Sequence, residues 1–229
     1  MPQLTFMRET ASSSEPTALD ITQLILAGWT GRDPEALQHH VDELALLGVF
    51  PPSTIPIFYR TGAELVTTAD RLQVLGPDTS GEVEYVLLAY PDGLWFTVGS
   101  DQTDRKAESV IGIAMSKQLA GKVLAPTAWR LADFADRWDS LRIRSWATID
   151  GQKVLYQDAT LGDIRPPAEL IEKYSGGNAL TVGTAMMSGT PGAIGGIRPA
   201  SRFDMAIEDP KTGKAIRHGY DINVLPVVA

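Results

Sequence analysis

The sequence predicts an α+β fold built on a large β core. Segments that alternate apolar and polar residues, or that are rich in β-branched and aromatic residues, outnumber segments with helical spacing. Two pairs of such segments, within 141–157 and 203–224, carry the turn residues of hairpins between them. Helical spacing is confined to short segments at 34–47, 103–119 and 167–174. Many strands with a few short helices are typical of the α+β class.

The first 50 residues are expected to form a small N-terminal section. A short strand at 4–6 leads into a polar, Ser-rich exposed turn at 10–16. The apolar run at 22–27 is predicted to be a strand. A helix is predicted for 34–47, because its larger apolar residues fall on one stripe and Asp33 precedes it as an N-cap.

Residues 51–229 are expected to form the main domain. A strand pair at 81–90 and 94–99 is joined by a turn at 91–93. A buried strand at 181–188 precedes a glycine-rich loop, and a further strand is predicted for 57–59. This part of the chain therefore supplies most of the predicted β core.

The charge of the chain limits its partners. A formal net charge of −8 and a pI near 4.9 argue against nucleic acid or an anionic membrane as a main partner. Cysteine is absent, so disulfides and thiolate metal sites are excluded. No stretch approaches the roughly 20 apolar residues of a transmembrane helix, and residues 1–16 lack the apolar region of a signal peptide. We therefore expect a cytoplasmic protein.

Three acidic residues form a candidate metal site. Glu82 and Glu84 are two apart on a predicted strand and so point to the same face, and Asp101 follows the next strand. Carboxylates that converge repel one another unless a cation joins them, and all-oxygen ligands suit Mg²⁺ or Mn²⁺ better than Zn²⁺. The plainer alternatives are a solvated strand face and, for Asp101, the N-cap of the helix predicted from Thr103.

A histidine and a glutamate form a candidate catalytic pair. His40 and Glu43 are three apart on the predicted helix, so their side chains share a face. A carboxylate beside an imidazole raises its basicity, and such a pair can take a proton from water. The alternative is an ordinary surface pair.

Two further features belong to the candidate site. The loop 189–196 is rich in glycine, so its backbone N–H groups can approach an anion, and the hydroxyl of Thr190 adds a donor. It does not match a P-loop, and a plain wide turn is the alternative. Lys117 and Lys122 follow the predicted helix after Asp101, and a lysine there would place positive charge beside an oxyanion. Each of these lysines is otherwise a surface residue.

In this order the motifs resemble those of the fumarylacetoacetate hydrolase family, from about residue 27 to the C-terminus. His40 and Glu43 resemble its His-x-x-Glu pair, and 82–88 resembles its Glu-x-Glu strand. The segment 96–105 resembles Tyr-Thr-Val-x-Asn-Asp-x-Thr-x-Arg, and 187–195 resembles the Thr-Gly-Thr-Pro-x-Gly-Val-Gly loop. The chain departs from the pattern at several positions, such as Ser100 in place of Asn, and so resembles a divergent branch.

The resemblance implies a mixed β-roll or β-sandwich core, a homodimer, and a Mg²⁺ or Mn²⁺ ion that Ca²⁺ can replace in a crystal. It implies roles for three groups of residues. These are metal ligands (Glu82, Glu84, Asp101), catalytic residues (His40, Glu43, Lys117, with Lys122 as the alternative lysine) and substrate-binding residues (Arg105, Gly189, Thr190).

The expected activity is cleavage of a C–C bond in a small 2-oxo acid or 1,3-diketo acid, through an enolate that the ion stabilises. Decarboxylation, isomerisation and hydration run through the same enolate and stay open as alternatives. A non-catalytic protein that binds small acids is a second alternative. The expected partner is a small oxo acid, without nucleic acid or membrane.

Overall fold

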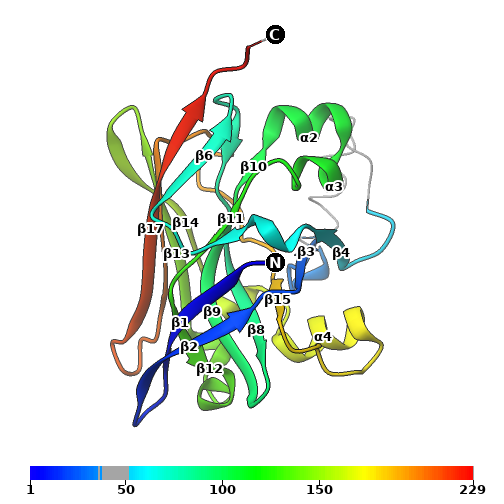
Figure 1. The fold of residues 1–229 in the computed structure, drawn as a ribbon, viewed down its shortest axis with the longest axis vertical. Helices are drawn as coiled ribbons and strands as arrows, with labels where there is room; N and C mark the ends of the chain where they lie inside the picture. The colour runs from blue at the N-terminus through cyan, green and yellow to red at the C-terminus, as the bar shows by residue number, and fades with distance from the viewer. Residues whose placement is uncertain (36, 38–51, 229) are drawn as a thin grey trace.

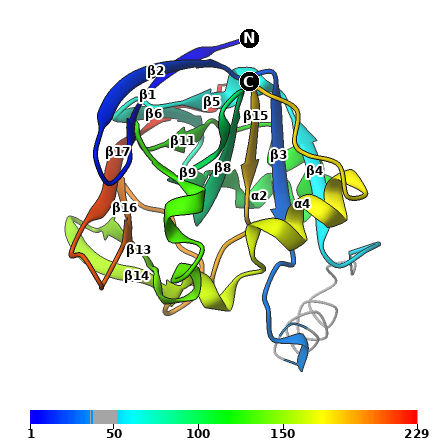
Figure 2. The same cartoon turned by 90° about the horizontal axis from the view of Figure 1, so that it is seen from below.

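Two mixed β-sheets pack against each other and make up most of the protein (Figure 1). The computed structural model describes residues 1–35, 37 and 52–228. The larger sheet curls on itself when it is seen from below (Figure 2), and the second sheet lies along one side of it. The α+β class with a β-roll core is therefore confirmed.

The larger sheet has ten strands, most of them in the order β2-β1-β12-β9-β8-β15-β3-β4. Short strands β11 and β5 complete it, with β11 paired to both β9 and β5. The strand bounds are β1 Gln3–Glu9, β2 Ser14–Asp20, β3 Gln23–Gly28, β4 Ile57–Thr61, β5 Val66–Thr67, β8 Val83–Tyr90, β9 Gly93–Asp101, β11 Lys122–Leu124, β12 Thr127–Arg130 and β15 Thr184–Met187.

The second sheet has five strands in the order β14-β13-β16-β17-β6. Its bounds are β6 Arg71–Leu75, β13 Arg142–Ile149, β14 Gln152–Thr160, β16 Arg202–Glu208 and β17 Ala215–Leu225. Both hairpins predicted from the sequence, β13–β14 and β16–β17, are present. At the first of them Asp150 and Gly151 both have positive φ, of 50° and 76°, as a tight turn between strands requires.

Short helices lie outside the sheets. The α-helices among the described residues are α2 (Arg105–Ile111), α3 (Ile113–Ser116) and α4 (Pro167–Ser175). The helix α4 ends at Gly176 in the left-handed conformation, as its sequence predicts. The remaining short elements are β7 Thr79–Ser80, β10 Thr103–Asp104, η1 Ala63–Leu65, η2 Leu131–Phe134, η3 Trp138–Ser140 and η4 Leu161–Asp163. No helix in the described part of the chain is long and apolar enough to cross a membrane.

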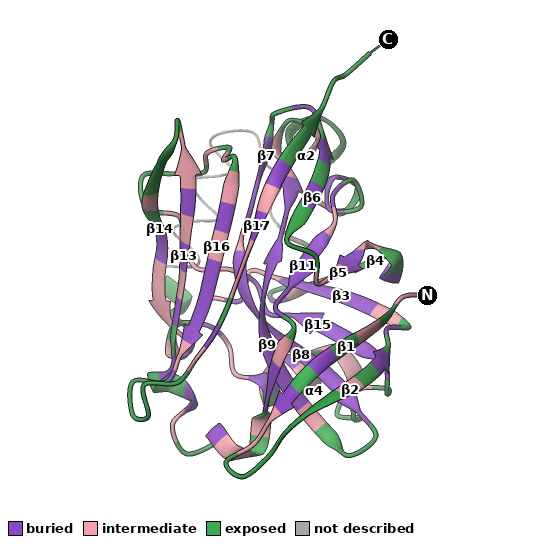
Figure 3. Ribbon diagram, turned by 60° about the vertical axis from the view of Figure 1, so that its left-hand side comes forward, coloured by how far each residue is buried: buried purple, intermediate pink, exposed green. Residues whose placement is uncertain are grey.

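The strand β8 is buried on both faces (Figure 3), because two hydrophobic cores meet across it. Tyr85 and Leu87 pack into the core between the two sheets. Val86 and Leu88, which alternate with them, pack into a second core inside the curl of the larger sheet. This double burial explains why the strand is apolar along nearly its whole length.

The helix predicted for 103–119 differs in the structure. Thr103 begins the short strand β10, and the helical part is broken at Gly112, whose φ is 86°. The N-cap of α2 is Asp104, which accepts a hydrogen bond from the backbone of Ala107 at 2.8 Å. The alternative role of Asp101 as a helix N-cap is therefore wrong, because the helix starts three residues later than that role needs.

The N-terminal residues also contain more strand than the sequence predicts. The exposed turn predicted for 10–16 is shorter in the structure. Ser14 already starts β2, which pairs along its length with β1. Serine and proline weaken the strand pattern there, and hairpin pairing outweighs it. The strands β5, β6, β11 and β12 were not predicted either. The division into 1–50 and 51–229 stays a prediction, since residue 50 lies outside the described residues.

Candidate metal centre

The three predicted acids lie together at one end of the β8–β9 hairpin. Glu82 precedes β8, Glu84 is its second residue and Asp101 ends β9. Because these strands are antiparallel, with Glu84 opposite Gly99, the start of β8 lies beside the end of β9. One carboxylate oxygen of each acid lies within 4.8 Å of the others.

The cluster faces the inside of the curled sheet. Glu82 and Glu84 follow the same alternation as Val86 and Leu88, which line the inner core. Glu84 is 2 % exposed and Asp101 1 % exposed, whereas the side chain of Glu82 keeps 16 % of its surface accessible. Solvent therefore reaches the cluster on the Glu82 side.

Three basic side chains surround the acids. The ammonium of Lys117 lies 3.3 Å from Glu82 Oε2 and also contacts Asp101 Oδ2. Lys122, which pairs with Asp101 across β11 and β9, lies 2.8 Å from its other oxygen, Oδ1. Arg105 lies 3.0 Å from Glu82 Oε1. Each oxygen of Glu82 and of Asp101 thus has a basic partner.

Among the described residues, no basic side chain forms an ion pair with Glu84, the second acid of the motif. Burial raises the pKa of Glu84 well above its usual range, and the nearby charge of Asp101 adds to that rise. Burial acts in the same direction on Asp101, but Lys117 and Lys122 outweigh it and hold its pKa far below the usual value. The cluster therefore contains one strongly ionised carboxylate and one whose charge is poorly compensated.

The glycine-rich loop holds Glu84 from the other side. The backbone N–H of Gly189 donates to Glu84 Oε2 at 2.7 Å. Gly189 has φ 84°, and a Cβ there would lie 2.2 Å from Thr30 Oγ1, so only glycine fits. The hydroxyl of Thr190 donates to the carbonyl oxygen of Val83 at 2.8 Å. In the described structure both loop residues thus contact the strand that carries the acids.

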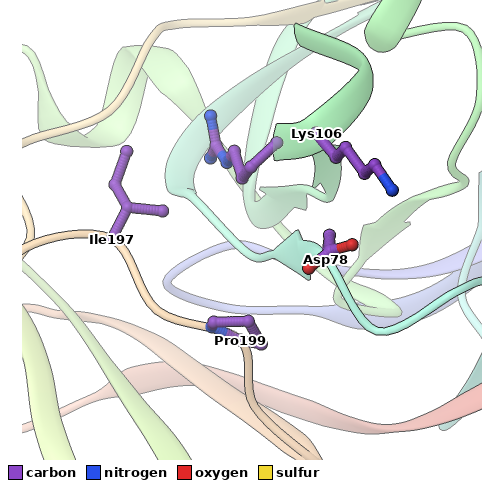
Figure 4. Close-up of a pocket in the computed structure, with 5 residues that line it drawn as sticks. Asp78, Lys106, Ile197 and Pro199 are labelled. Atoms are coloured by element: carbon purple, nitrogen blue, oxygen red, sulfur yellow. The ribbon is translucent and has the colours of Figure 1, made fainter. Parts of the chain in front are cut away.

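An open pocket of about 330 Å³ adjoins the cluster through Arg105 (Figure 4). Lys106 and Asp78 line it, and Ile197 lies across it from Lys106. Arg105 itself is held by Glu82, by Glu108 at 2.9 Å and by the hydroxyl of Ser80 at 2.7 Å. The pocket thus has both charged and apolar walls, and Arg105 is the side chain that joins it to the acids.

The donor set fits a hard divalent cation. Carboxylate oxygens are the ligands that Mg²⁺ and Mn²⁺ prefer, and Glu82, Glu84 and Asp101 place three of them close together. A cation between them would also compensate the charge of Glu84, whose raised pKa reflects burial beside Asp101. The solvated strand face considered as an alternative is wrong for Glu84 and Asp101, since both are buried.

Sequence reasoning located only part of this site. His40 and Glu43 lie outside the described residues. Lys122 was predicted only as the alternative to Lys117, yet both lysines contact Asp101. The buried Gln157, which bonds to both Val83 and Thr190, was missed, because an isolated glutamine in a hairpin carries no spacing signal.

Solved structures with the same fold come from the fumarylacetoacetate hydrolase family and related enzymes. A fumarylpyruvate hydrolase from Pseudomonas aeruginosa, in complex with Mn²⁺ and pyruvate, has a TM-score of 0.60 at 15% identity, covering 97% of this chain and 96% of that one. A 2-keto-3-deoxy-D-arabinonate dehydratase, complexed with magnesium and 2,5-dioxopentanoate, has a TM-score of 0.64 at 14% identity (95% and 79% covered). A protein from Oleispira antarctica, provisionally described as a fumarylacetoacetate isomerase/hydrolase, has a TM-score of 0.66 at 16% identity (96% and 99% covered).

The fold and the acidic cluster therefore define a protein with the fumarylacetoacetate hydrolase fold and a candidate site for a divalent metal. Within that class, the chain belongs to the family described as "Protein of unknown function (DUF2848)", whose model matches residues 27–220. No curated protein matches the chain. Identities of 14–16% to the solved structures establish the fold alone. The predicted resemblance to a divergent branch of the fumarylacetoacetate hydrolase family is confirmed at the level of the fold.

Proposed function

We propose that this protein is a Mg²⁺- or Mn²⁺-dependent hydrolase that cleaves a C–C bond in a small 2-oxo or 1,3-diketo acid. The observation that carries the proposal is the buried cluster of Glu82, Glu84 and Asp101 with the ammonium of Lys117 between two of its members. Such a cluster joins a place for a hard cation with a fixed positive charge at its edge.

The three acids share one part in this proposal, and other groups orient them. Glu82, Glu84 and Asp101 would hold the ion, which when bound supplies Lewis-acid polarisation of a keto oxygen and stabilises an enolate. Gly189 orients Glu84 by its N–H, and Arg105 orients Glu82. The carboxylates are thus held in place before any ligand arrives, which lowers the cost of binding one.

Lys117 is the better candidate for the reactive lysine. It lies on the Glu82 side of the cluster, where solvent reaches the site. Lys122 is fully buried and is held by Asp101 and by the carbonyl oxygen of Gln102 at 2.6 Å. Lys117 would therefore face a substrate and stabilise the negative charge that develops on it, while Lys122 neutralises Asp101.

The water-activating base of the proposal is His40, oriented by Glu43. Their spacing of three residues supports the pairing. If His40 removes a proton from the attacking water, a His40→Ala variant will bind substrate but lose about 10²-fold or more in kcat. Turnover at the wild-type rate would show that the base is another group.

The proposed substrate contacts are Arg105, Gly189 and Thr190. The pocket beside Arg105 supports a substrate that extends from the acids toward Lys106 and Ile197. The loop of Gly189 and Thr190 borders Glu84, so a carboxylate held by this loop would lie next to the metal ligands. We also propose that the protein acts in the cytoplasm as a homodimer, without nucleic acid or membrane partners.

The solved relatives favour a small oxo acid as the ligand and keep a second reaction in view. The Pseudomonas aeruginosa protein was solved with pyruvate, and the dehydratase with 2,5-dioxopentanoate. Because one of them is a dehydratase, loss of water from a 2-oxo acid is the second candidate function. Decarboxylation and isomerisation would use the same enolate.

Product analysis separates these reactions. Purified protein with Mg²⁺ or Mn²⁺ is expected to release pyruvate and a second acid from acylpyruvates, and to lose this activity with a chelator or with Glu82→Gln. A product that is dehydrated or has lost CO₂ instead would favour a lyase. Metal-dependent binding of oxo acids without turnover of any of them would favour a binding protein, and unchanged metal affinity in Glu82→Gln would overturn the metal assignment.

A further inference from the structure

A buried glutamine connects the two sheets at the acidic cluster. Gln157 lies in β14 of the second sheet and is 1 % exposed. Its side chain reaches across to the first residue of β8, Val83, and to the loop that follows β15. Buried polar groups are costly unless they are hydrogen-bonded, so the contacts of this amide determine what it contributes.

Every hydrogen-bonding position of the Gln157 amide is used. Its Oε1 accepts from the N–H of Val83 and from the hydroxyl of Ser145, both at 2.9 Å. Its Nε2 donates to Thr190 Oγ1 at 2.7 Å and to the carbonyl oxygen of Pro191 at 2.6 Å. The backbone N–H can only donate and the carbonyl can only accept, so the orientation of the amide is unambiguous.

These bonds close a ring around Val83, the residue between Glu82 and Glu84. Gln157 holds the N–H of Val83, Thr190 holds its C=O at 2.8 Å, and Gln157 donates to Thr190. The pairing of β15 with β8 runs only as far as Val86, and beyond it Ser188 bonds to Tyr85. Gln157 and Thr190 therefore replace a missing strand partner at the point where β8 carries its acids.

We propose that Gln157 is a positioning residue for the divalent-cation site. It is not a metal ligand in this proposal, because both polar atoms of its amide are hydrogen-bonded to other protein groups. By holding the N–H of Val83 directly and its C=O through Thr190, Gln157 sets the direction in which Glu82 and Glu84 leave the strand. Partners of this kind are typically worth about 10- to 100-fold in metal affinity. The inference rests on the proposed metal site.

The test is the affinity for Mn²⁺ alone, measured by calorimetry and by the paramagnetic resonance of free Mn²⁺. Gln157→Met keeps the length of the side chain but removes its four hydrogen bonds, and we expect the Kd to rise about 10- to 100-fold. Ser145→Ala is the matched control, because it removes one bond to the same Oε1 at an equally buried position without touching the ring. Both variants will lower the Tm, but only Gln157→Met will weaken Mn²⁺ binding.

A second pair of variants covers failure of Gln157→Met to fold. Thr190→Val removes the bond to Val83 and is expected to raise the Kd, whereas Thr190→Ser keeps the hydroxyl and is expected to restore it. If the wild type binds Mn²⁺ but the Kd of Gln157→Met or Thr190→Val stays within twofold of that of its control, the inference is overturned and the proposed function is not. Wild-type protein that binds no Mn²⁺ would overturn the proposed function and the inference together.

Discussion

Two carboxylates of the cluster differ in how their charge is compensated. Asp101 has a lysine at each oxygen, and these lysines hold its pKa far below the usual value despite burial. For Glu84, burial and the neighbouring acids raise the pKa, and the charge of Lys117 and the N–H of Gly189 offset only part of that rise. A buried carboxylate whose ionised form is unfavourable without a cation, but which the fold keeps in place, is typical of a functional site.

Replacement of Glu84 by glutamine is expected to stabilise the chelator-treated protein. When the pKa of a carboxyl group is higher in the folded than in the unfolded protein, its contribution to stability is fully present below the unfolded pKa of about 4.3. That contribution is lost as the pH rises. The wild type is therefore penalised at pH 7, and Glu84→Gln, whose amide oxygen can still accept from Gly189, is not. Thermal unfolding with EDTA should show a higher Tm for the variant at pH 7 and no gain near pH 4.

Glu82→Gln is the matched control with the opposite sign. Burial raises the pKa of Glu82, but Arg105 and Lys117 outweigh it, so the net shift is downward and ionised Glu82 contributes to stability at pH 7. Its replacement should lower the Tm under the same conditions. A lower Tm for both variants would show that Glu84 is well compensated in solution.

The two lysines at Asp101 are expected to differ in what they support. Lys122→Met leaves a fully buried carboxylate with one partner fewer and should cost about 3–5 kcal/mol of unfolding free energy. Lys117→Met also removes a partner of Asp101 and is expected to be destabilised too, but of the two variants it should be the one whose folded protein loses kcat. Urea unfolding together with steady-state kinetics checks this assignment, and the reverse pattern would make Lys122 the reactive lysine.

At the scale of elements, the site depends on the loop after β15. This loop must turn tightly enough for one N–H to meet Glu84 and for a hydroxyl to meet Val83. Gly189 makes the turn possible, because it combines a positive φ with an approach to Thr30 that leaves no room for a side chain. Loop and strand thus form one unit with the acids.

Gly189→Ala is therefore expected to be far more harmful than an alanine at another left-handed glycine. Gly213 has φ 73°, and no atom of the described residues lies within 4 Å of a Cβ added there, so Gly213→Ala carries only the backbone cost of about 1–2 kcal/mol. Gly189→Ala adds steric overlap and should cost about 3 kcal/mol or more. Urea unfolding in EDTA compares the two, and equal losses would mean that the loop relaxes freely.

For the whole molecule, a bound cation should stabilise both sheets together. The acids lie at the junction of β8, β9 and β11, and Gln157 links them to the second sheet. Mg²⁺ at 100 times its Kd is expected to raise the free energy of unfolding by about 2.7 kcal/mol. A single cooperative transition, followed by tryptophan fluorescence, should shift to higher temperature in the wild type but not in Glu84→Gln.

Local patterns in the sequence predicted much of this architecture. The two hairpins of the second sheet, the pair β8–β9 and the helix α4 follow from alternation, turn residues and a glycine stop. The short strands β5, β11 and β12 could not be predicted, because two to four residues carry no measurable period. The strand β2 was missed for another reason: its polar residues become a strand only by pairing with β1.

The sequence by itself identified the three acids as a candidate site, through their spacing and the order of the motifs around them. Two glutamates two apart on a strand must share a face, whatever surrounds them. Only the tertiary structure decided which charges meet these acids. Lys117, Lys122 and Arg105 reach them from three separate elements, and Gln157 of the other sheet bonds Val83, the residue between two of them. These contacts depend on how strands distant in sequence pair, and one-dimensional spacing carries no information on that pairing.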